Sequence, residues 1–482
     1  MKSTKKHDKC GKVPKHKTNG DDLRRALNWI VSSDIFTQVR LHGNVKWKPV
    51  ALVCLAIFWV WSSQPGLVDA ANDAIATVTK LYGSDGVAVT SYQALTAALV
   101  RYTPQLLPAL WARVQSLMEQ TGQAAWRVGK WLPLAVDGSR VSVPRTQQNE
   151  ERFNKPRKRR GKKRSRTNKR GRHALRKRQK QRAKSHYDPQ AVGPQMWLTL
   201  VWHISLRLPW CWMLGPSYSS ERGHLETVLT ERRFPKFTLF CGDAGFVGYD
   251  FWWSILDHGH SFLMRVGGNV RLLKGLGVVR QRGDIVYCWP DKAMRKTQPP
   301  LVLRLLCFHD GRGEVYLVTN ILDDKELTNK QASLIYRGRW GIELQFRSLK
   351  QTYGRSKLRA RTPEIAEIEL HWSLLGLTLL QLLAMKEQTR AGEPADKTSI
   401  AAVLRIIRSM IADPSETRPP SASLPNRMRN ATTDSYQRHS KKQSRNYPRR
   451  KEEPCTGAPI ILMATEEQRE RARNILADKR AA

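Results

Sequence analysis

Acidic residues are scarce in this 482-residue chain relative to basic ones. The chain has 41 Asp and Glu against 83 Lys and Arg, which gives a formal net charge of +42 at pH 7. An excess of this size creates a strongly positive potential that attracts polyanions. The charge favours nucleic acid as the partner, with binding that weakens as salt rises. An anionic membrane surface is the alternative partner.

The sequence also lacks a cysteine framework and a long apolar run. Its 7 cysteines are scattered and form no CxxC pair or zinc-type Cys/His array, which favours a reducing compartment and ordinary core thiols. The apolar runs at 50–61 and 370–385 are shorter than the ~18 residues that a membrane span needs, so we expect buried core helices there. The basic N-terminus has no apolar stretch of the secretory type. We therefore expect a soluble cytoplasmic protein.

Composition and pattern divide the chain into four regions. Residues 1–20 are a basic tail that we expect to be disordered. Residues 21–129 predict a helical domain, with helices at 21–32, 48–62, 66–82, 91–99 and 103–120. This domain carries Arg24, Arg25, Arg40 and Lys46, and it either reads a DNA site or serves packing or dimerisation. Residues 387–482 form a basic C-terminal region, for which dimerisation is a candidate role. We expect a linker or phosphate-binding tail at 412–455 and a last helix at 465–479.

The third region, residues 130–386, alternates strands with helices and predicts an α/β fold. The expected order is β-β-β-α-β-α-β. The strands are expected at 132–136, 196–205, 210–215, 237–242 and 261–266, and the helices at 220–231 and 249–258. This order matches a ribonuclease H-like core, in which acids from distant segments meet at the edge of the sheet. Residues 267–322 read as a β-rich insertion. The apolar helix at 363–386 is expected to pack back on the sheet.

A basic insertion at 150–188 interrupts this region. Residues 152–184 contain 19 Lys and Arg and no acid. Such a segment cannot bury a core, so we expect a disordered or partly helical insertion. Mutual repulsion keeps it extended until phosphates neutralise it, which favours a non-specific DNA-binding arm.

Two aspartates stand where apolar strands are expected to end. Asp137 follows the strand at 132–136 and precedes Gly138, and Asp243 follows the strand at 237–242 in a Gly-rich turn. A carboxylate at the end of a buried strand is held rigidly, as a metal ligand must be. For Asp137 the alternative is an ordinary turn aspartate.

A third acid lies in the helix expected from Thr328 or Asn329 to about 354. Tyr336, Arg339, Glu343 and Lys350 are offset by 0, 3, 7 and 14 residues. At about 100° per residue they fall within an arc of roughly 60° on a helix. One face then carries a carboxylate flanked by two cations and a phenol. The alternative is a solvated helix face with ion pairs, and two glycines, Gly338 and Gly341, imply a kink or break.

The spacing Tyr336-x2-Arg339-x3-Glu343-x6-Lys350 resembles the YREK signature of DDE transposases of the insertion-sequence-four family. Asp137 in Val-Asp-Gly-Ser and Asp243 in Gly-Asp-Ala-Gly-Phe match the two aspartates of that family. The resemblance covers roughly residues 130–385. It implies a ribonuclease H-like catalytic core with a β-strand insertion before the glutamate. The basic tract at 152–184 exceeds the family pattern.

The resemblance also implies a chemistry and a set of roles. Asp137, Asp243 and Glu343 would hold two Mg²⁺ ions, with Mn²⁺ able to substitute, for phosphodiester cleavage and strand transfer. Tyr336, Arg339 and Lys350 would contact the DNA backbone. In members that make a hairpin intermediate an aromatic residue stacks on a flipped base, for which Trp289 is a candidate, and the alternative is a half-buried Trp of the insertion. The expected partners are terminal inverted repeats, target DNA and a second copy of the chain, in a nucleoid-associated protein. A nuclease without strand transfer and a domesticated DNA-binding protein without catalysis are the alternatives.

Overall fold

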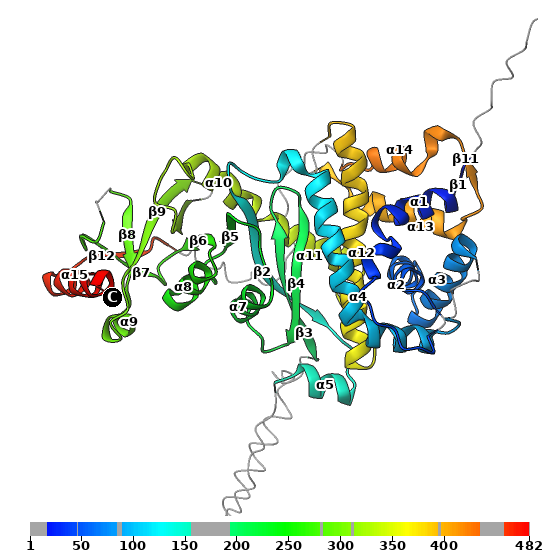
Figure 1. Ribbon diagram of the computed structural model, residues 1–482, viewed down its shortest axis with the longest axis horizontal. Helices are drawn as coiled ribbons and strands as arrows, with labels where there is room; N and C mark the ends of the chain where they lie inside the picture. Colours follow the sequence, from blue (N-terminus) through cyan, green and yellow to red (C-terminus); the bar gives the residue numbers. More distant parts are fainter. Residues whose placement is uncertain are drawn as a thin grey trace, which may run out of the picture. The chain divides into compact units, whose positions relative to one another are not determined.

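The structure is a computed structural model that describes residues 17–45, 47–83, 89–155, 193–279, 283–309, 313–393, 397–433 and 457–481 (Figure 1). The chain divides into two compact units. One comprises residues 1–121 and 372–435, and the other comprises 122–371 and 436–482. Most of the N-terminal tail, most of the basic tract at 152–184, the C-terminal basic stretch at 434–456 and Lys46 lie outside the described residues.

The first unit is built mainly from helices. They are α1 (Asn19–Ile30), α2 (Pro49–Trp61), α3 (Leu67–Tyr82), α4 (Tyr92–Thr121), α13 (Ile400–Ala412), α14 (Leu424–Arg429) and the later part of α12 (Pro363–Arg390). Helix α2 is apolar on all sides, and every residue from Leu52 to Trp61 is buried. A helix without a polar face is stable only inside a core, so α2 forms the centre of this unit.

Two predictions for the first unit are wrong. The segments 91–99 and 103–120 form one helix, α4, which continues through Pro104 and Pro108. Its face from Leu95 to Leu117 is buried along the length of the helix, and this burial offsets the hydrogen bonds that the two prolines remove. Residues 413–433, predicted to be part of a linker, are also folded. Strand β11 (Thr417–Arg418) pairs with β1 (Lys17–Thr18), and Asp22 accepts the backbone N–H of Leu424 at 2.8 Å.

Helix α12 is long and apolar enough to span a bilayer by length and composition, but 94 % of its most apolar window is buried in the protein. It is therefore a core helix, as predicted. The helix is divided between the two units. From Trp372 onward the helix belongs to the first unit, where Trp372 Nε1 donates to Thr103 Oγ1 at 2.9 Å and Trp61 Nε1 donates to Gly376 O at 3.0 Å.

The second unit contains a ten-stranded mixed sheet in the order β12-β7-β8-β9-β10-β6-β5-β2-β3-β4. Its strands are β2 (Leu132–Ser142), β3 (Gln195–His203), β4 (Leu208–Pro216), β5 (Thr238–Gly242), β6 (Ser261–Val266), β7 (Arg271–Lys274), β8 (Ile285–Cys288), β9 (Leu301–His309), β10 (Glu314–Thr319) and β12 (Ile460–Met463). Its helices are α5 (Gln147–Phe153), α7 (Glu221–Glu231), α8 (Tyr249–Asp257), α9 (Asp291–Arg295), α10 (Asn329–Gly338), α11 (Gly341–Arg347) and α15 (Glu466–Ala481).

The predicted α/β order of this unit is confirmed. Strands β2, β3 and β4 form an antiparallel meander, and β5 and β6 follow as parallel neighbours of β2. Every residue of β5 is buried, as parallel strands covered on both faces require. The predicted insertion strands are also present, and they continue the same sheet because β10 pairs with β6. The late strand β12 then adds to β7 at the edge of the sheet.

The helix that carries the third acid is broken, as its glycines predicted. Helix α10 begins at a capping box of Thr328 and Gln331 and ends at Gly338; α11 begins at Gly341, and a π-helical turn follows at Ser348–Thr352. Both glycines lie against strand β3 or its end. A Cβ at Gly338 would lie 2.6 Å from Ile204 Cγ2, and one at Gly341 would lie 2.0 Å from Trp202 Cη2. Only glycine lets the backbone approach so closely.

Candidate active site

Asp137 lies inside strand β2, so the prediction that the strand ends there is wrong. Strand β2 continues to Ser142, and it pairs with β3 through the whole of this extension. Pairing with β5 on the other side stops at Ala135–Cys241. Asp137 therefore stands just beyond the point at which β2 loses its parallel neighbour. The backbone N–H of Gly138 donates to Asp137 Oδ1 at 2.8 Å and orients the carboxylate.

Asp243 follows β5, as predicted. The backbone N–H of Gly245 donates to Asp243 Oδ1 at 2.8 Å, so a tight turn fixes this carboxylate. Because β2 and β5 are parallel neighbours, Asp137 and Asp243 emerge toward the same end of the sheet.

Glu343 reaches the same region from helix α11, which packs against β2. Burial raises the pKa of the Glu343 carboxyl, the charge of Arg339 opposes that shift, and the charge of Asp243 adds to it. Burial also raises the pKa of Asp137 to about 6, and the charges of Asp243 and Glu343 add to this effect. The fold thus brings the three acids predicted from the sequence within electrostatic reach of one another.

Arg339 is the cation of this cluster. Its side chain is 9 % exposed, its guanidinium carbon lies 5.4 Å from the centre of the Tyr336 ring, and its Nε has no hydrogen-bond partner among the described residues. Its charge lowers the pKa of both Asp137 and Glu343. Tyr336 is 8 % exposed. A DNA phosphate could therefore contact either side chain only through its small exposed part.

Lys350 lies in the π-helical turn, and its Nζ donates to Ser139 Oγ at 2.6 Å. Ser139 is two residues after Asp137 on β2. Burial lowers the pKa of the Lys350 ammonium group. The hydrogen bond places this ammonium beside the strand that carries the first aspartate.

The structure does not support the base-stacking role expected of Trp289. Its side chain is 4 % exposed just after β8, and its Nε1 donates to Gln298 O at 2.8 Å. A ring that stacks on a base must present an open face. Trp289 is instead buried within the insertion.

A fourth acid, Glu221, was missed in the sequence. It is the first residue of α7, whose N-cap is Ser220. A Cβ at Gly138 would lie 2.6 Å from Glu221 Oε1, so the Glu221 side chain lies directly against the residue after Asp137. Burial raises the pKa of Glu221 to about 7, and the charges of Asp137 and Asp243 add to the shift. A helix-starting glutamate is common, and only the packing of α7 on β2 and β3 reveals its position.

The donor atoms of this site fit a hard divalent cation in their chemistry. They are carboxylate oxygens, which such ions prefer, and their charges raise one another's pKa, as like charges do, although the charge of Arg339 opposes part of that effect. Among the described residues, no group of three or more His, Cys, Asp or Glu side chains is already arranged to hold a metal ion. Side-chain rotation would be needed to bring the oxygens together.

A buried ion pair fixes the chain beyond Lys350. Glu369 is fully buried on α12, its Oε2 accepts the backbone N–H groups of Arg359 and Ala360 at 3.0 and 3.1 Å, and its Oε1 lies 3.7 Å from Arg355 Nε. Removing one partner of a buried pair leaves the other charge uncompensated. These contacts therefore hold the segment that connects the π-helical turn to α12.

Replacing Glu369 with alanine is expected to lower the free energy of unfolding by about 3–5 kcal/mol, measured by urea denaturation. The matched control is Glu367→Ala two residues earlier. Glu367 pairs with the exposed Arg152 at 3.1 Å, and its loss is expected to cost less than ~1 kcal/mol. Equal effects of the two substitutions would contradict the role assigned to Glu369.

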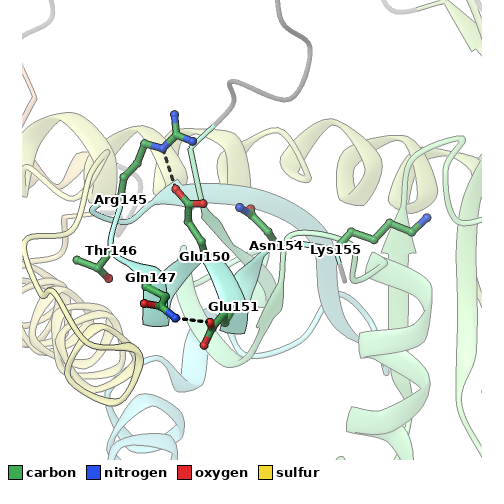
Figure 2. Close-up of a pocket in the computed structure, with 7 residues that line it drawn as sticks. All are labelled: Arg145, Thr146, Gln147, Glu150, Glu151, Asn154 and Lys155. Atoms are coloured by element: carbon green, nitrogen blue, oxygen red, sulfur yellow. Dashed lines mark hydrogen bonds and ion pairs between the residues drawn. The ribbon is translucent and has the colours of Figure 1, made fainter. Parts of the chain in front are cut away.

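A separate pocket of about 560 Å³ lies around helix α5 (Figure 2). Arg145 Nε donates to Glu150 Oε1 and Gln147 Nε2 donates to Glu151 Oε1, each at 2.9 Å, along its wall. None of the four acids described above lines it.

Comparisons with known proteins agree on one family. Residues 132–379 match the family described as "Transposase DDE domain". The chain is 28 % identical over 223 residues to a transposase for insertion sequence element IS4 from Escherichia coli (strain K12), a match that covers 44 % of this chain and 49 % of that protein. It is 27 % identical over 153 residues to a putative transposase from Sinorhizobium fredii (strain NBRC 101917 / NGR234), which covers 30 % of this chain and 41 % of that protein.

A solved structure, the piggyBac transposase synaptic complex with hairpin DNA, aligns with 90 % of this chain and 88 % of its own, at 10 % identity and a TM-score of 0.37. A score this low supports no argument. The chain matches about half or less of the length of the two sequence relatives. The family match itself spans more than half of this chain and includes Asp137, Asp243 and Glu343. This DDE domain implies dependence on a divalent metal, and the chain belongs to the family of DDE transposases.

Proposed function

We propose that this protein cuts DNA at the ends of its own insertion sequence and joins those ends to target DNA. The observation that carries the proposal is the acid cluster, in which Asp137, Asp243 and Glu343 come from three distant segments and lie within electrostatic reach of one another and of Arg339. The strand order β4-β3-β2-β5-β6, with three antiparallel strands and two parallel ones, supports a ribonuclease H-like core.

We propose that the site binds two Mg²⁺ ions, for which Mn²⁺ can substitute. When bound, these ions would activate the attacking oxygen and stabilise the leaving oxygen of an in-line displacement at phosphorus. Asp137, Asp243 and Glu343 provide the oxygen ligands. The attacking group is water in the cleavage step and the freed 3′-hydroxyl of the DNA in the joining step.

The cations of the site would bind and orient the scissile phosphate. Arg339 is already placed among the acids with an unpaired Nε, and its planar guanidinium suits phosphate oxygens. Tyr336 supports the Arg339 guanidinium with its ring. Lys350, held by Ser139, would contact the DNA backbone beside the first aspartate.

Further parts of the proposal concern partners and location. The first unit is proposed to bind the terminal inverted repeats, although two of its arginines, Arg24 and Arg25, pair with Asp21 and Asp22 on their own helix. Two copies of the chain would hold the two ends in a synaptic dimer. A protein that works on the chromosome in this way is cytoplasmic and nucleoid-associated.

The test incubates the purified protein with Mg²⁺, a target plasmid and a fragment that carries the candidate terminal repeats. Wild type is expected to cleave and join, Glu343→Ala is expected to do neither while still binding the ends, and the exposed Glu226→Ala serves as the control. Undiminished joining by Glu343→Ala would refute the assignment of Glu343. Cleavage of any duplex without joining would favour a nuclease, and end binding without cleavage by wild type would favour a domesticated DNA-binding protein.

A further inference from the structure

Glu221 is placed beside the acid cluster by two independent constraints. The Ser220 side chain caps α7 by accepting the Gly223 N–H at 3.1 Å, which fixes Glu221 as the first residue of the helix. Helix α7 then packs against β2 and β3. The start of the helix thus lies over the part of β2 that carries Asp137.

The side chain of Glu221 reaches toward both aspartates. A Cβ at Gly138 would lie 2.5 Å from Glu221 Cγ, so the absence of a side chain at Gly138 makes room for the glutamate. A Cβ at Gly245 would lie 3.0 Å from Asp243 Oδ1 and 4.0 Å from Glu221 Oε2. The Glu221 carboxylate therefore lies between the residue that follows Asp137 and the turn that holds Asp243.

A purely structural role does not account for this position. The backbone N–H of Gly138 is the one group that favours the ionised form of Glu221, and among the described residues no Lys, Arg or His forms an ion pair with it, although the side chain is only partly exposed and two aspartates lie nearby. An unpaired carboxylate next to like charges destabilises the fold. A cation bound beside Glu221 would make the charge of this carboxylate stabilising, because a metal ion is the largest local charge in such a site.

We infer that Glu221 is a fourth carboxylate of the metal centre, a ligand or close counter-charge in addition to Asp137, Asp243 and Glu343. This inference rests on the proposed function. The charges support it. Four carboxylates carry a charge of −4 and two divalent ions carry +4, so the charges of Arg339 and Lys350 are left to balance DNA phosphates. With three carboxylates the loaded centre would hold one further positive charge without a partner.

The experiment measures metal binding directly, without DNA. Mn²⁺ is titrated into the full-length protein and the free ion is followed by electron paramagnetic resonance. Wild type is compared with Glu221→Gln, Glu221→Asp, Glu343→Gln and Glu226→Gln. Glu226 is exposed on the same helix and is the matched control. Thermal melting of each variant reports whether it is folded.

Glu221→Gln is expected to weaken at least one Mn²⁺ site by about tenfold or more, with melting at or above the wild-type temperature. Glu226→Gln is expected to bind as wild type, and Glu221→Asp to recover part of the lost affinity. Wild-type affinity in Glu221→Gln, alongside weakened binding in Glu343→Gln, would overturn the inference and leave the proposed function intact. No saturable Mn²⁺ binding by the wild type would instead count against the proposed function.

Discussion

Replacing Asp137 with asparagine is expected to abolish catalysis and at the same time stabilise the metal-free protein. Cleavage should fall by on the order of 10³-fold or more, because an amide is a poor ligand for the ions that the reaction requires. The free energy of unfolding should rise by roughly 1–3 kcal/mol, because the substitution removes a charge that burial and two neighbouring carboxylates oppose. Asparagine retains an oxygen that can accept the Gly138 N–H.

Strand cleavage is measured with Mg²⁺ present, and thermal melting is measured with a chelator present. The control is Asp257→Asn at an exposed position on α8, which is expected to change neither quantity much. A large loss of stability in Asp137→Asn would mean that the carboxylate serves to hold β2 in place. If Asp137→Asn still cleaved DNA at the wild-type rate, Asp137 would not be a catalytic residue.

Replacing Gly341 with alanine is the second substitution with a large expected effect. The new Cβ would meet Trp202, whose side chain is 1 % exposed on β3 and has no room to move away. The start of α11 must then shift, and it carries Glu343 two residues later. We expect a loss of about 1–3 kcal/mol in stability from overpacking and a loss of about 10²-fold in cleavage from the displaced carboxylate.

Cleavage rate and urea denaturation are measured on the same preparation. The control is Gly283→Ala, where a Cβ would have no atom of another described residue within 4 Å and the backbone is not left-handed. That variant should behave as wild type. If Gly341→Ala also left the cleavage rate and the free energy of unfolding unchanged, contact with β3 would not be the cause of the break between α10 and α11.

Features of the structure that depend on a few neighbouring residues could be predicted from the sequence. Asp243 could be placed because a short apolar strand and a glycine turn define its position with no help from the rest of the fold. Gly338 and Gly341 predicted a break in the helix for the same reason. Arg339 and Glu343 lie on either side of that break, and the charge of Arg339 still acts on the Glu343 carboxyl.

Other features depended on tertiary contacts that a local pattern does not contain. Asp137-Gly138 is a turn signal, yet hydrogen bonds to β3 carry β2 past it to Ser142. Helix α4 continues through two prolines because burial of its apolar face offsets the hydrogen bonds that the prolines remove. The burial of Trp289 is set by the β8–β9 region, and the position of Glu221 is set by where α7 packs. Neither has a signature in the neighbouring residues.

The first unit is discontinuous in sequence, which has a consequence for its synthesis on the ribosome. Asp22 accepts a hydrogen bond from Leu424, 402 residues later, and the segment that completes this unit begins at Trp372. At ~5–20 residues per second, the early helices would wait about 20–80 s for their partners. The whole of 122–371, with all four acids, is translated in that interval. A message cut short near residue 371 would therefore still encode every acid of the site, yet its product would lack the residues that the N-terminal helices need to finish folding.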